Sequence, residues 1–211
     1  MPKKVSSIIK NYMKNQVTIA VDPVNTAATN VLHQYHVVQA KDRYETVKRI
    51  ADINPNIYGI VFCRTRRETK VVSNRLMVDG YNADALHGDL SQSQRDEVMN
   101  RFRKSQLQLL VATDVAARGL DVNNLSHIIN YNLPDDPEIY THRSGRTGRA
   151  GRTGISIAIV HSRELRRLKD IEKISGVTFS KELVPTGEAV SYTHLRAHET
   201  VLDLVCRLLL E

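Results

Sequence analysis

The sequence predicts a parallel α/β domain whose single sheet is covered by helices on both faces. Short, nearly continuous apolar runs recur along the 211 residues, as expected for strands that are buried on both sides. Segments with the apolar spacing of amphipathic helices separate these runs. Polar loops follow several of the runs, and a doubly wound sheet binds its ligands at the carboxyl ends of the strands.

The expected strands and helices alternate through a domain that covers residues 31–187. Residues 33–39 alternate in polarity, whereas residues 58–63 are apolar throughout. Gly80 ends the helix that begins near residue 67. The expected strands lie at residues 33–39, 58–63, 82–86, 107–113, 127–133 and 155–160. The expected helices begin near residues 42, 67, 91, 137 and 162.

Two of these helix starts carry specific signals. Ser91 and Gln94 form a capping-box pattern, in which each side chain bonds a backbone N–H at the start of the helix. Asp136, Pro137 and Glu138 supply an N-cap, a first-position proline and a first-turn acid. The second of these helices is therefore expected to run into an arginine-rich stretch and to end among glycines.

Residues 140–154 carry four arginines and four glycines at a constant spacing of three. On a helix, this spacing could place Arg143, Arg146 and Arg149 on one slowly drifting face. The glycines permit close approach of the backbone to a bulky anion or to a neighbouring domain, so the combination suits phosphate. The alternative is a solvated basic face, in which arginines only complement the dipole at a helix end.

Three polar loops follow the expected strands, at residues 64–66, 87–89 and 113–121. Each loop alone has the composition of an ordinary polar turn. The carboxyl ends of parallel strands share one edge of the sheet, so the three loops are expected to lie together. With the arginine-rich stretch they predict a common anion site.

Composition points to a polyanionic partner and a cytoplasmic location. The formal net charge is +7 and no apolar run approaches the length of a membrane span. The chain has no Trp and only three Phe, so a nucleic acid would be held mainly through its backbone. Cys63 and Cys206 do not have a metal-binding spacing. We therefore expect both to be ordinary thiols, and we expect no metal site.

Four segments resemble the motifs of a known family. Residues 60–66 (Ile-Val-Phe-Cys-Arg-Thr-Arg) resemble motif IV, and residues 92–95 (Gln-Ser-Gln-Arg) resemble a Gln-x-x-Arg motif. Residues 112–121 resemble motif V, and residues 142–149 resemble motif VI. In this order they resemble the second RecA-like lobe of the DEAD-box ATP-dependent RNA helicases, particularly the bacterial cold-shock type. The resemblance covers about residues 1–187.

The resemblance implies a role for each matching residue. Arg146 and Arg149 would be catalytic arginine fingers that reach the γ-phosphate of ATP. ATP binding is expected from Asp121 and Gly119. RNA-backbone binding is expected from Arg95, Gln92, Gly88, Thr113 and Arg66. Coupling between the lobes is expected from Arg118, His142 and Arg143, although His142 could equally be a structural histidine.

The sequence departs from the family pattern in two places. It contains neither a Gly-x-x-x-x-Gly-Lys-Ser/Thr phosphate loop nor an Asp-Glu-Ala-Asp run, so ATP and Mg²⁺ would be held mainly by a missing N-terminal RecA-like lobe. The chain alone is therefore expected to be inactive. Residues 188–211 do not resemble the family and look like translated vector or adapter sequence; a genuine amphipathic helix is the alternative. Residues 1–21 would be the end of the first lobe and residues 22–30 the interlobe linker.

Two functions follow from the sequence. The first is one half of an ATP-dependent helicase that binds single-stranded RNA and unwinds short RNA duplexes, with possible ribosome-assembly or RNA-degradation partners. The second is a stand-alone RNA-binding or interaction module without catalysis. A lobe of a DNA-directed helicase is disfavoured because residues 142–149 have the DEAD-box form of motif VI.

Overall fold

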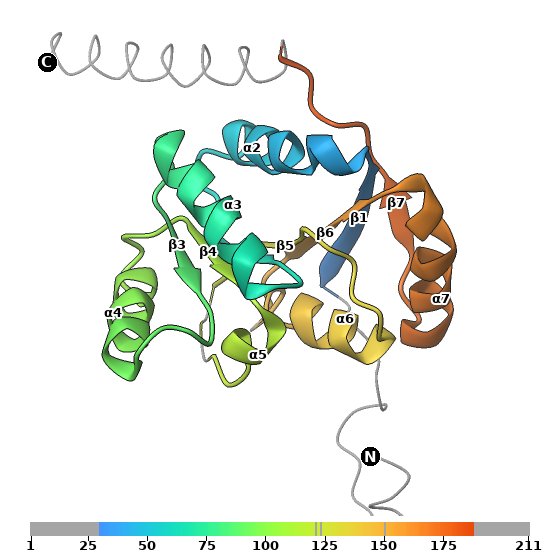
Figure 1. The fold of residues 1–211 in the computed structure, drawn as a ribbon. Coiled ribbons are helices and arrows are strands. Elements are labelled where there is room, and N and C mark those ends of the chain that lie inside the picture. Colours follow the sequence, from blue (N-terminus) through green and yellow to red (C-terminus); the bar gives the residue numbers. More distant parts are fainter. Residues whose placement is uncertain (1–29, 121, 123, 150, 188–211) are drawn as a thin grey trace, which may run out of the picture.

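The computed structural model describes residues 30–120, 122, 124–149 and 151–187. The segments predicted at residues 1–21 and 188–211 lie outside this part, as does the predicted linker at 22–30 except for Asn30. Within the described part, seven strands form one sheet in the order β3-β4-β2-β5-β6-β1-β7, and all of the strand pairs are parallel (Figure 1). The predicted doubly wound parallel sheet is therefore confirmed.

Strands and helices alternate along the chain. The strands are β1 (Val31–Val37), β2 (Gly59–Phe62), β3 (Ala83–Leu86), β4 (Leu109–Ala112), β5 (His127–Asn130), β6 (Gly154–Val160) and β7 (Phe179–Lys181). The α-helices are α2 (Arg43–Ile53), α3 (Arg66–Val78), α4 (Gln92–Arg103), α5 (Asp114–Ala117), α6 (Pro137–Ser144) and α7 (Leu165–Ser175). Two 3₁₀ turns, η1 (Ala40–Asp42) and η2 (Ser162–Glu164), precede α2 and α7.

Helices cover both faces of the sheet, as Figure 1 shows. Neighbouring side chains of β2 point to opposite faces, so Val61 belongs to the core under α2 and α3, whereas Ile60 belongs to the core under α4 and α5. A third core cluster joins α6 and α7 to the β6 and β7 side of the sheet through Tyr140 and Leu168. Strands buried on both faces explain the continuous apolar runs of the sequence.

Two elements were not predicted from the sequence. The α5 helix spans only Asp114–Ala117, which is too short to produce a helical repeat in the sequence. The β7 strand is only three residues long and pairs with β1 at the edge of the sheet. Both predicted helix-start signals are confirmed: Ser91 and Gln94 form a complete capping box, and the Asp136 side chain accepts a hydrogen bond from the Glu138 N–H.

The register places the predicted polar loops at one edge. Phe62 pairs with Ala112 and Asn130, and Leu86 also pairs with Ala112, so the last residues of β2, β3, β4 and β5 are aligned. The loops that follow β2, β3 and β4 therefore lie side by side. No helix within the described residues is long and apolar enough to span a membrane.

Candidate functional site

A buried arginine fastens α6 to α5 at this edge of the sheet. Arg143 Nε and Nη2 donate to the two carboxylate oxygens of Asp114 at 2.6 and 2.7 Å. Arg143 Nη1 donates to Asn130 Oδ1 at 2.9 Å and to the Asn132 carbonyl at 2.8 Å. The guanidinium group also lies 4.9 Å from the centre of the Phe62 ring. We call Arg143, Asp114, Asn130 and Asn132 the buried polar centre.

The ends of α5 and α6 explain why these groups meet. The Thr113 side chain caps α5 by accepting from the Ala116 N–H at 3.4 Å, which places Asp114 in the first turn of the helix. The α6 helix ends at Ser144, so Arg143 lies in the helix, whereas Arg146, Arg149 and Arg152 follow it. Arg143 is also buried, at 3% exposed, and the other three are not. The expectation that Arg143, Arg146 and Arg149 share one helix face is therefore wrong.

Arg146 and Arg149 lie in the turn that follows α6. Arg146 Nη1 donates to the Leu120 carbonyl at 2.7 Å, which joins this turn to the segment after α5. Arg149 is exposed, and its Nε donates to the Gly145 carbonyl at 2.8 Å. With Arg152, both arginines line a pocket of about 200 Å³ that is also lined by Thr147 and Thr153. Three cations around one small pocket favour an anionic ligand.

The glycines of this segment serve internal packing as well. A Cβ on Gly154 would collide with the Thr147 side chain, whose hydroxyl donates to the Leu125 carbonyl. Gly148 has a φ of +68°, and a Cβ there would lie 2.6 Å from Val31 Cγ2. The sequence predicted that such glycines admit an anion or another domain. At Gly148 and Gly154, the closely approaching groups belong to this domain.

A second cavity, of about 310 Å³, lies between α5 and α6. It is lined by Phe62 of β2 and by residues of the two helices and of the segments that follow them, namely Asp114, Ala117, Arg118, Ile139, His142, Arg143 and Arg146. His142 and Arg118 are exposed at this cavity, and neither side chain has a hydrogen bond within the described part of the chain. His142 thus has no hydrogen-bonding partner in the described residues of the kind that a structural histidine would have, and its interlobe role stays a prediction. Gly119 is exposed and has a φ of +76°, which turns the chain back after α5.

A separate group of charges lies where β3 ends and α3 begins. Asp89 accepts hydrogen bonds from Arg66 through one carboxylate oxygen and from Lys70 Nζ, at 3.2 Å, through the other. The hydrogen bond from Arg66, followed by that from Lys70, holds the pKa of the Asp89 carboxyl below its usual range. The side chains of Arg66, Lys70 and Asp89 are 63%, 49% and 41% exposed. We call these three residues the exposed cation cluster.

Gly88 and His87 shape the loop that carries Asp89. Gly88 is exposed, and the stem of Arg66 passes 3.9 Å from the place where a Cβ would lie. The Asp89 N–H donates to His87 Nδ1 at 3.3 Å, which requires that nitrogen to be unprotonated. Burial, with help from Lys70, lowers the pKa of His87 and favours this neutral form. The backbone around Gly88 is therefore both open and ordered.

Of the remaining predicted RNA-binding residues, Arg95 and Thr113 are each hydrogen-bonded to Ala116 of α5. Arg95 Nη2 donates to the Ala116 carbonyl at 3.3 Å, so the start of α4 is tied to the loop that Thr113 begins. Gln92 is exposed on α4, and its amide donates to Asp96 in the same helix at 2.9 Å. The structure thus brings Arg95 near Thr113 and Arg66 near Gly88. Asp121 lies outside the described residues.

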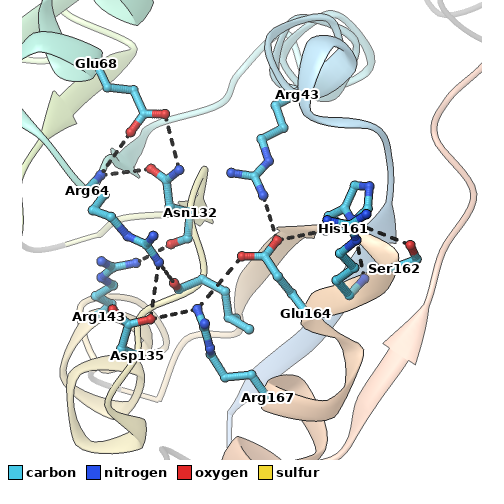
Figure 2. Close-up of polar contacts among 12 residues, drawn as sticks. Arg43, Arg64, Glu68, Asn132, Asp135, Arg143, His161, Ser162, Glu164 and Arg167 are labelled. Atoms are coloured by element: carbon cyan, nitrogen blue, oxygen red, sulfur yellow. Dashed lines mark hydrogen bonds and ion pairs between the residues drawn. The ribbon is translucent and has the colours of Figure 1, made fainter.

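Sequence reasoning missed a chain of ion pairs that continues along the same edge (Figure 2). Arg64 Nη2 and Arg167 Nη1 both lie close to Asp135 Oδ1, at 3.3 and 2.7 Å. Farther along, Arg43 Nη2 donates to Glu164 Oε2 at 2.6 Å. These contacts join α2, η2 and α7 to the start of α6. The partners are far apart in sequence, so no local spacing indicated them.

The underside of α6 carries a second network that the sequence did not reveal. The Tyr140 hydroxyl is fully buried, 2.6 Å from His33 Nδ1 and 3.0 Å from the Ser156 hydroxyl. These contacts join α6 to β1 and β6. Burial lowers the pKa of His33 to about 4. In the described part of the chain, no group of three or more His, Cys, Asp or Glu side chains could hold a metal ion, and Cys63 is a buried free thiol.

Comparison with known proteins places these features in context. A profile of the helicase conserved C-terminal domain matches residues 42–151. The probable ATP-dependent RNA helicase of Methanocaldococcus jannaschii is 42% identical over 181 residues, which are 86% of this chain and 48% of that protein. The ATP-dependent RNA helicase CshA of Limosilactobacillus reuteri is 39% identical over 190 residues, which are 89% of this chain and 38% of that protein.

A solved structure shows the same arrangement of elements. The structure of S. cerevisiae Dbp5 bound to RNA and ADP BeF3 matches 92% of this chain and 52% of its own with a TM-score of 0.80 and 26% identity. This chain spans about half the length, or less, of the curated relatives that it matches.

Proposed function

Because the chain belongs to the DEAD-box family of RNA helicases and carries their C-terminal RecA-like domain, we propose that it is the lobe that completes an ATP site held by an N-terminal lobe and grips the RNA backbone. In this proposal, Arg146 and Arg149 reach the γ-phosphate across the interface between the lobes. The RNA phosphates meet Arg66, Arg95 and the backbone around Gly88. The substrates are single-stranded RNA and short RNA duplexes.

The ATP half of the proposal rests on Arg146 and Arg149. Guanidinium groups stabilise charge that spreads over phosphoryl oxygens in the transition state, and such fingers contribute on the order of 10³ to 10⁵ in rate. The pocket that these arginines share with Arg152 supports binding of a phosphate. ATP and Mg²⁺ are held mainly by the N-terminal lobe in this proposal, and Asp121 and Gly119 are assigned to the nucleotide on the family motif.

The RNA half of the proposal rests on the edge formed by β3 and β4. The exposed cations of Arg66 and Lys70 lie beside Gly88, whose backbone is accessible. Arg95, on α4, is hydrogen-bonded to Ala116 of α5. Gln92 and Thr113 are assigned to RNA on the family motifs. Contacts of this kind recognise the sugar-phosphate backbone rather than base sequence. Such recognition is compatible with a chain that has no Trp and three Phe.

The single observation that carries the proposal is the bidentate contact of Arg143 with Asp114. This contact joins α5 to α6. The cap residue of α5 is Thr113, which the proposal assigns to RNA, and the turn that follows α6 carries Arg146 and Arg149. A shift of α5 on RNA binding would therefore move the turn after α6. In this proposal, Arg143 couples the two sites from inside the lobe, and exposed Arg118 and His142 take the direct contacts with the other lobe.

The test is ATP turnover in the presence of excess single-stranded RNA. We expect no turnover by this chain alone and measurable turnover after addition of a separately prepared N-terminal lobe from a DEAD-box relative. Arg149→Ala and Arg149→Lys are both expected to lower that turnover at least a hundredfold, because lysine lacks the planar fork.

Arg152→Ala is the matched control, because Arg152 is also exposed, lines the same pocket and lies outside the motif. It is expected to lower turnover less than threefold, well below the thousandfold scale of a finger. Equal losses in Arg149→Ala and Arg152→Ala would contradict the assignment of Arg149 as a finger. Turnover by this chain alone would contradict the need for a second lobe.

A stand-alone RNA-binding module is the second candidate. The observation that favours it is that Arg66 and Arg95 are both held by hydrogen bonds within this domain, with Gly88 beside Arg66. Binding of single-stranded RNA by this chain, unchanged by ATP and the N-terminal lobe, would favour this candidate. We propose a cytoplasmic location with either function. Ribosome-assembly or RNA-degradation partners belong to the helicase proposal.

A further inference from the structure

Asp89 occupies the two cations that the proposed function offers to RNA. Its two carboxylate oxygens each accept from a different donor, Arg66 and Lys70, so neither cation of the exposed cation cluster faces solvent without a counter-charge. Arg66 begins α3, and Lys70 lies one turn later on the same side of the helix. The carboxylate therefore bridges the two positions that a backbone phosphate would use.

The contact is of a kind that a phosphate can replace. Carboxylate and phosphate oxygens compete for the same guanidinium and ammonium N–H groups. All three side chains are substantially exposed, and exposed ion pairs contribute only about 0–1 kcal/mol each. The buried polar centre cannot exchange its anion in this way, because all three guanidinium nitrogens of Arg143 donate hydrogen bonds within the domain and its side chain is 4% exposed.

We propose that Asp89 is an affinity-determining residue that acts as an internal competitor of the RNA phosphate for Arg66 and Lys70. RNA binding exchanges one anion for another at these cations, so it gains less free energy than binding to unoccupied cations. It also releases fewer salt ions, because Asp89 already takes the place of part of the ion atmosphere. This inference rests on the proposed binding of RNA at the exposed cation cluster.

A different role for Asp89 predicts the opposite result. If its carboxylate served to orient Arg66 for RNA, its removal would weaken binding. A competitor and an orienting group are therefore distinguished by the direction of the change in affinity. The Asp89→Asn substitution keeps the size and polarity of the side chain while removing its charge.

The experiment measures the affinity of this chain for a fluorescent ten-nucleotide oligouridylate between 50 and 200 mM salt. Asp89→Asn is expected to bind about three- to tenfold more tightly at the lowest salt, as two weak ion pairs are removed. The slope of the logarithm of the affinity against the logarithm of the salt concentration is expected to steepen by about one-half to one.

Asp84→Asn is the matched control, because it also raises the net charge by one and releases an exposed arginine, Arg101, from a 2.8 Å ion pair. It is expected to change the affinity less than twofold. In the double variant Arg66→Ala/Lys70→Ala, addition of Asp89→Asn is expected to produce no tightening beyond that of Asp84→Asn.

The outcomes separate the two proposals. Binding by the wild type, with equal effects of Asp89→Asn and Asp84→Asn, would overturn the competitor role and leave the proposed RNA binding intact. Weaker binding by Asp89→Asn would also overturn it, in favour of an orienting role. Failure of the wild type to bind the RNA, or binding that Arg66→Ala leaves unchanged, would overturn both proposals at this cluster.

Discussion

Two arginines at the same edge of the sheet have opposite environments. The side chain of Arg143, in the buried polar centre, is 4% exposed and donates four hydrogen bonds to groups of its own domain. Arg66, in the exposed cation cluster, is 63% exposed and shares one carboxylate with Lys70. The difference separates an arginine that fixes the positions of helices from one that can exchange its partner. Burial, rather than residue type, assigns these roles.

The largest expected effect is the loss of stability on removal of the buried arginine. Arg143→Met is expected to lower the free energy of unfolding by about 3 kcal/mol, because the buried Asn130 and Asn132 oxygens and Asp114 lose their donor. Arg66→Met is expected to change it by less than about 0.5 kcal/mol, since exposed ion pairs contribute little. Urea unfolding followed by circular dichroism measures both.

The same pair of variants can break the comparison. If Arg66→Met destabilised the domain as much as Arg143→Met, the exposed cation cluster would be a structural contact and not a place for partner exchange. Arg143→Lys keeps the charge but loses the bidentate geometry with Asp114, so an intermediate loss is expected. A neutral result for Arg143→Lys would show that charge alone holds α6 to α5.

Glycines extend the comparison to the backbone. Gly154→Ala is expected to cost about 2 kcal/mol, because the new Cβ collides with the Thr147 side chain and the Gly148 backbone in a packed region. Gly88→Ala is expected to cost less than about 0.5 kcal/mol, since the nearest atom, Arg66 Cδ, lies 3.9 Å away. Thermal or urea unfolding compares the two.

Gly88→Ala should nevertheless weaken RNA binding by the exposed cation cluster, because the methyl group lies where the backbone is proposed to approach the RNA. Unchanged RNA affinity would remove Gly88 from the proposed contact. A stable Gly154→Ala would show that Thr147 and its turn can move aside, contrary to the close packing described above.

The sheet was predictable from the sequence because it depends on local patterns. Apolar runs and the capping signals at Ser91 and Asp136 identified most strands and helices within a few residues of their ends. The environments of Arg143 and Arg66 were not predictable, since they depend on Asp114 and Asp89, which other elements bring into contact. The regular spacing of the arginines suggested a common role, whereas the end of α6 at Ser144 separates them.

The buried contacts of Tyr140 with His33 and Ser156 provide a smaller test of how α6, and with it Arg143, is positioned. Tyr140→Phe is expected to cost about 1.5 kcal/mol, because the buried His33 and Ser156 side chains lose their partner while the ring still fills its place. Tyr35→Phe is the matched control: its ring also packs on Phe179, and its hydroxyl has no hydrogen bond within the described residues. Equal effects of the two variants would show that the hydroxyl network contributes nothing to α6.

The smallest expected effect is a change in stability with pH. It occurs at a higher pH for the His33 network under α6 than for Asp89 of the exposed cation cluster. Burial lowers the pKa of His33 to about 4, so between pH 6.5 and pH 4 the unfolded chain binds a proton that the folded chain does not. Stability is therefore lost as pH falls through 6.5, and this loss is complete below about pH 4. The pKa of Asp89 is lowered as well, but a carboxyl of this kind loses its contribution only below its unfolded value of 3.8.

His33→Gln measures this effect against the wild type. At pH 8 the variant is expected to be less stable, because it disturbs the contact with Tyr140, and no titration of His33 contributes there. At pH 5.5 the gap is expected to narrow by about 1 kcal/mol, since only the wild type carries the histidine penalty. A gap that stayed constant from pH 8 to pH 5.5 would mean that the folded and unfolded chains bind protons equally at His33, so that burial does not lower its pKa.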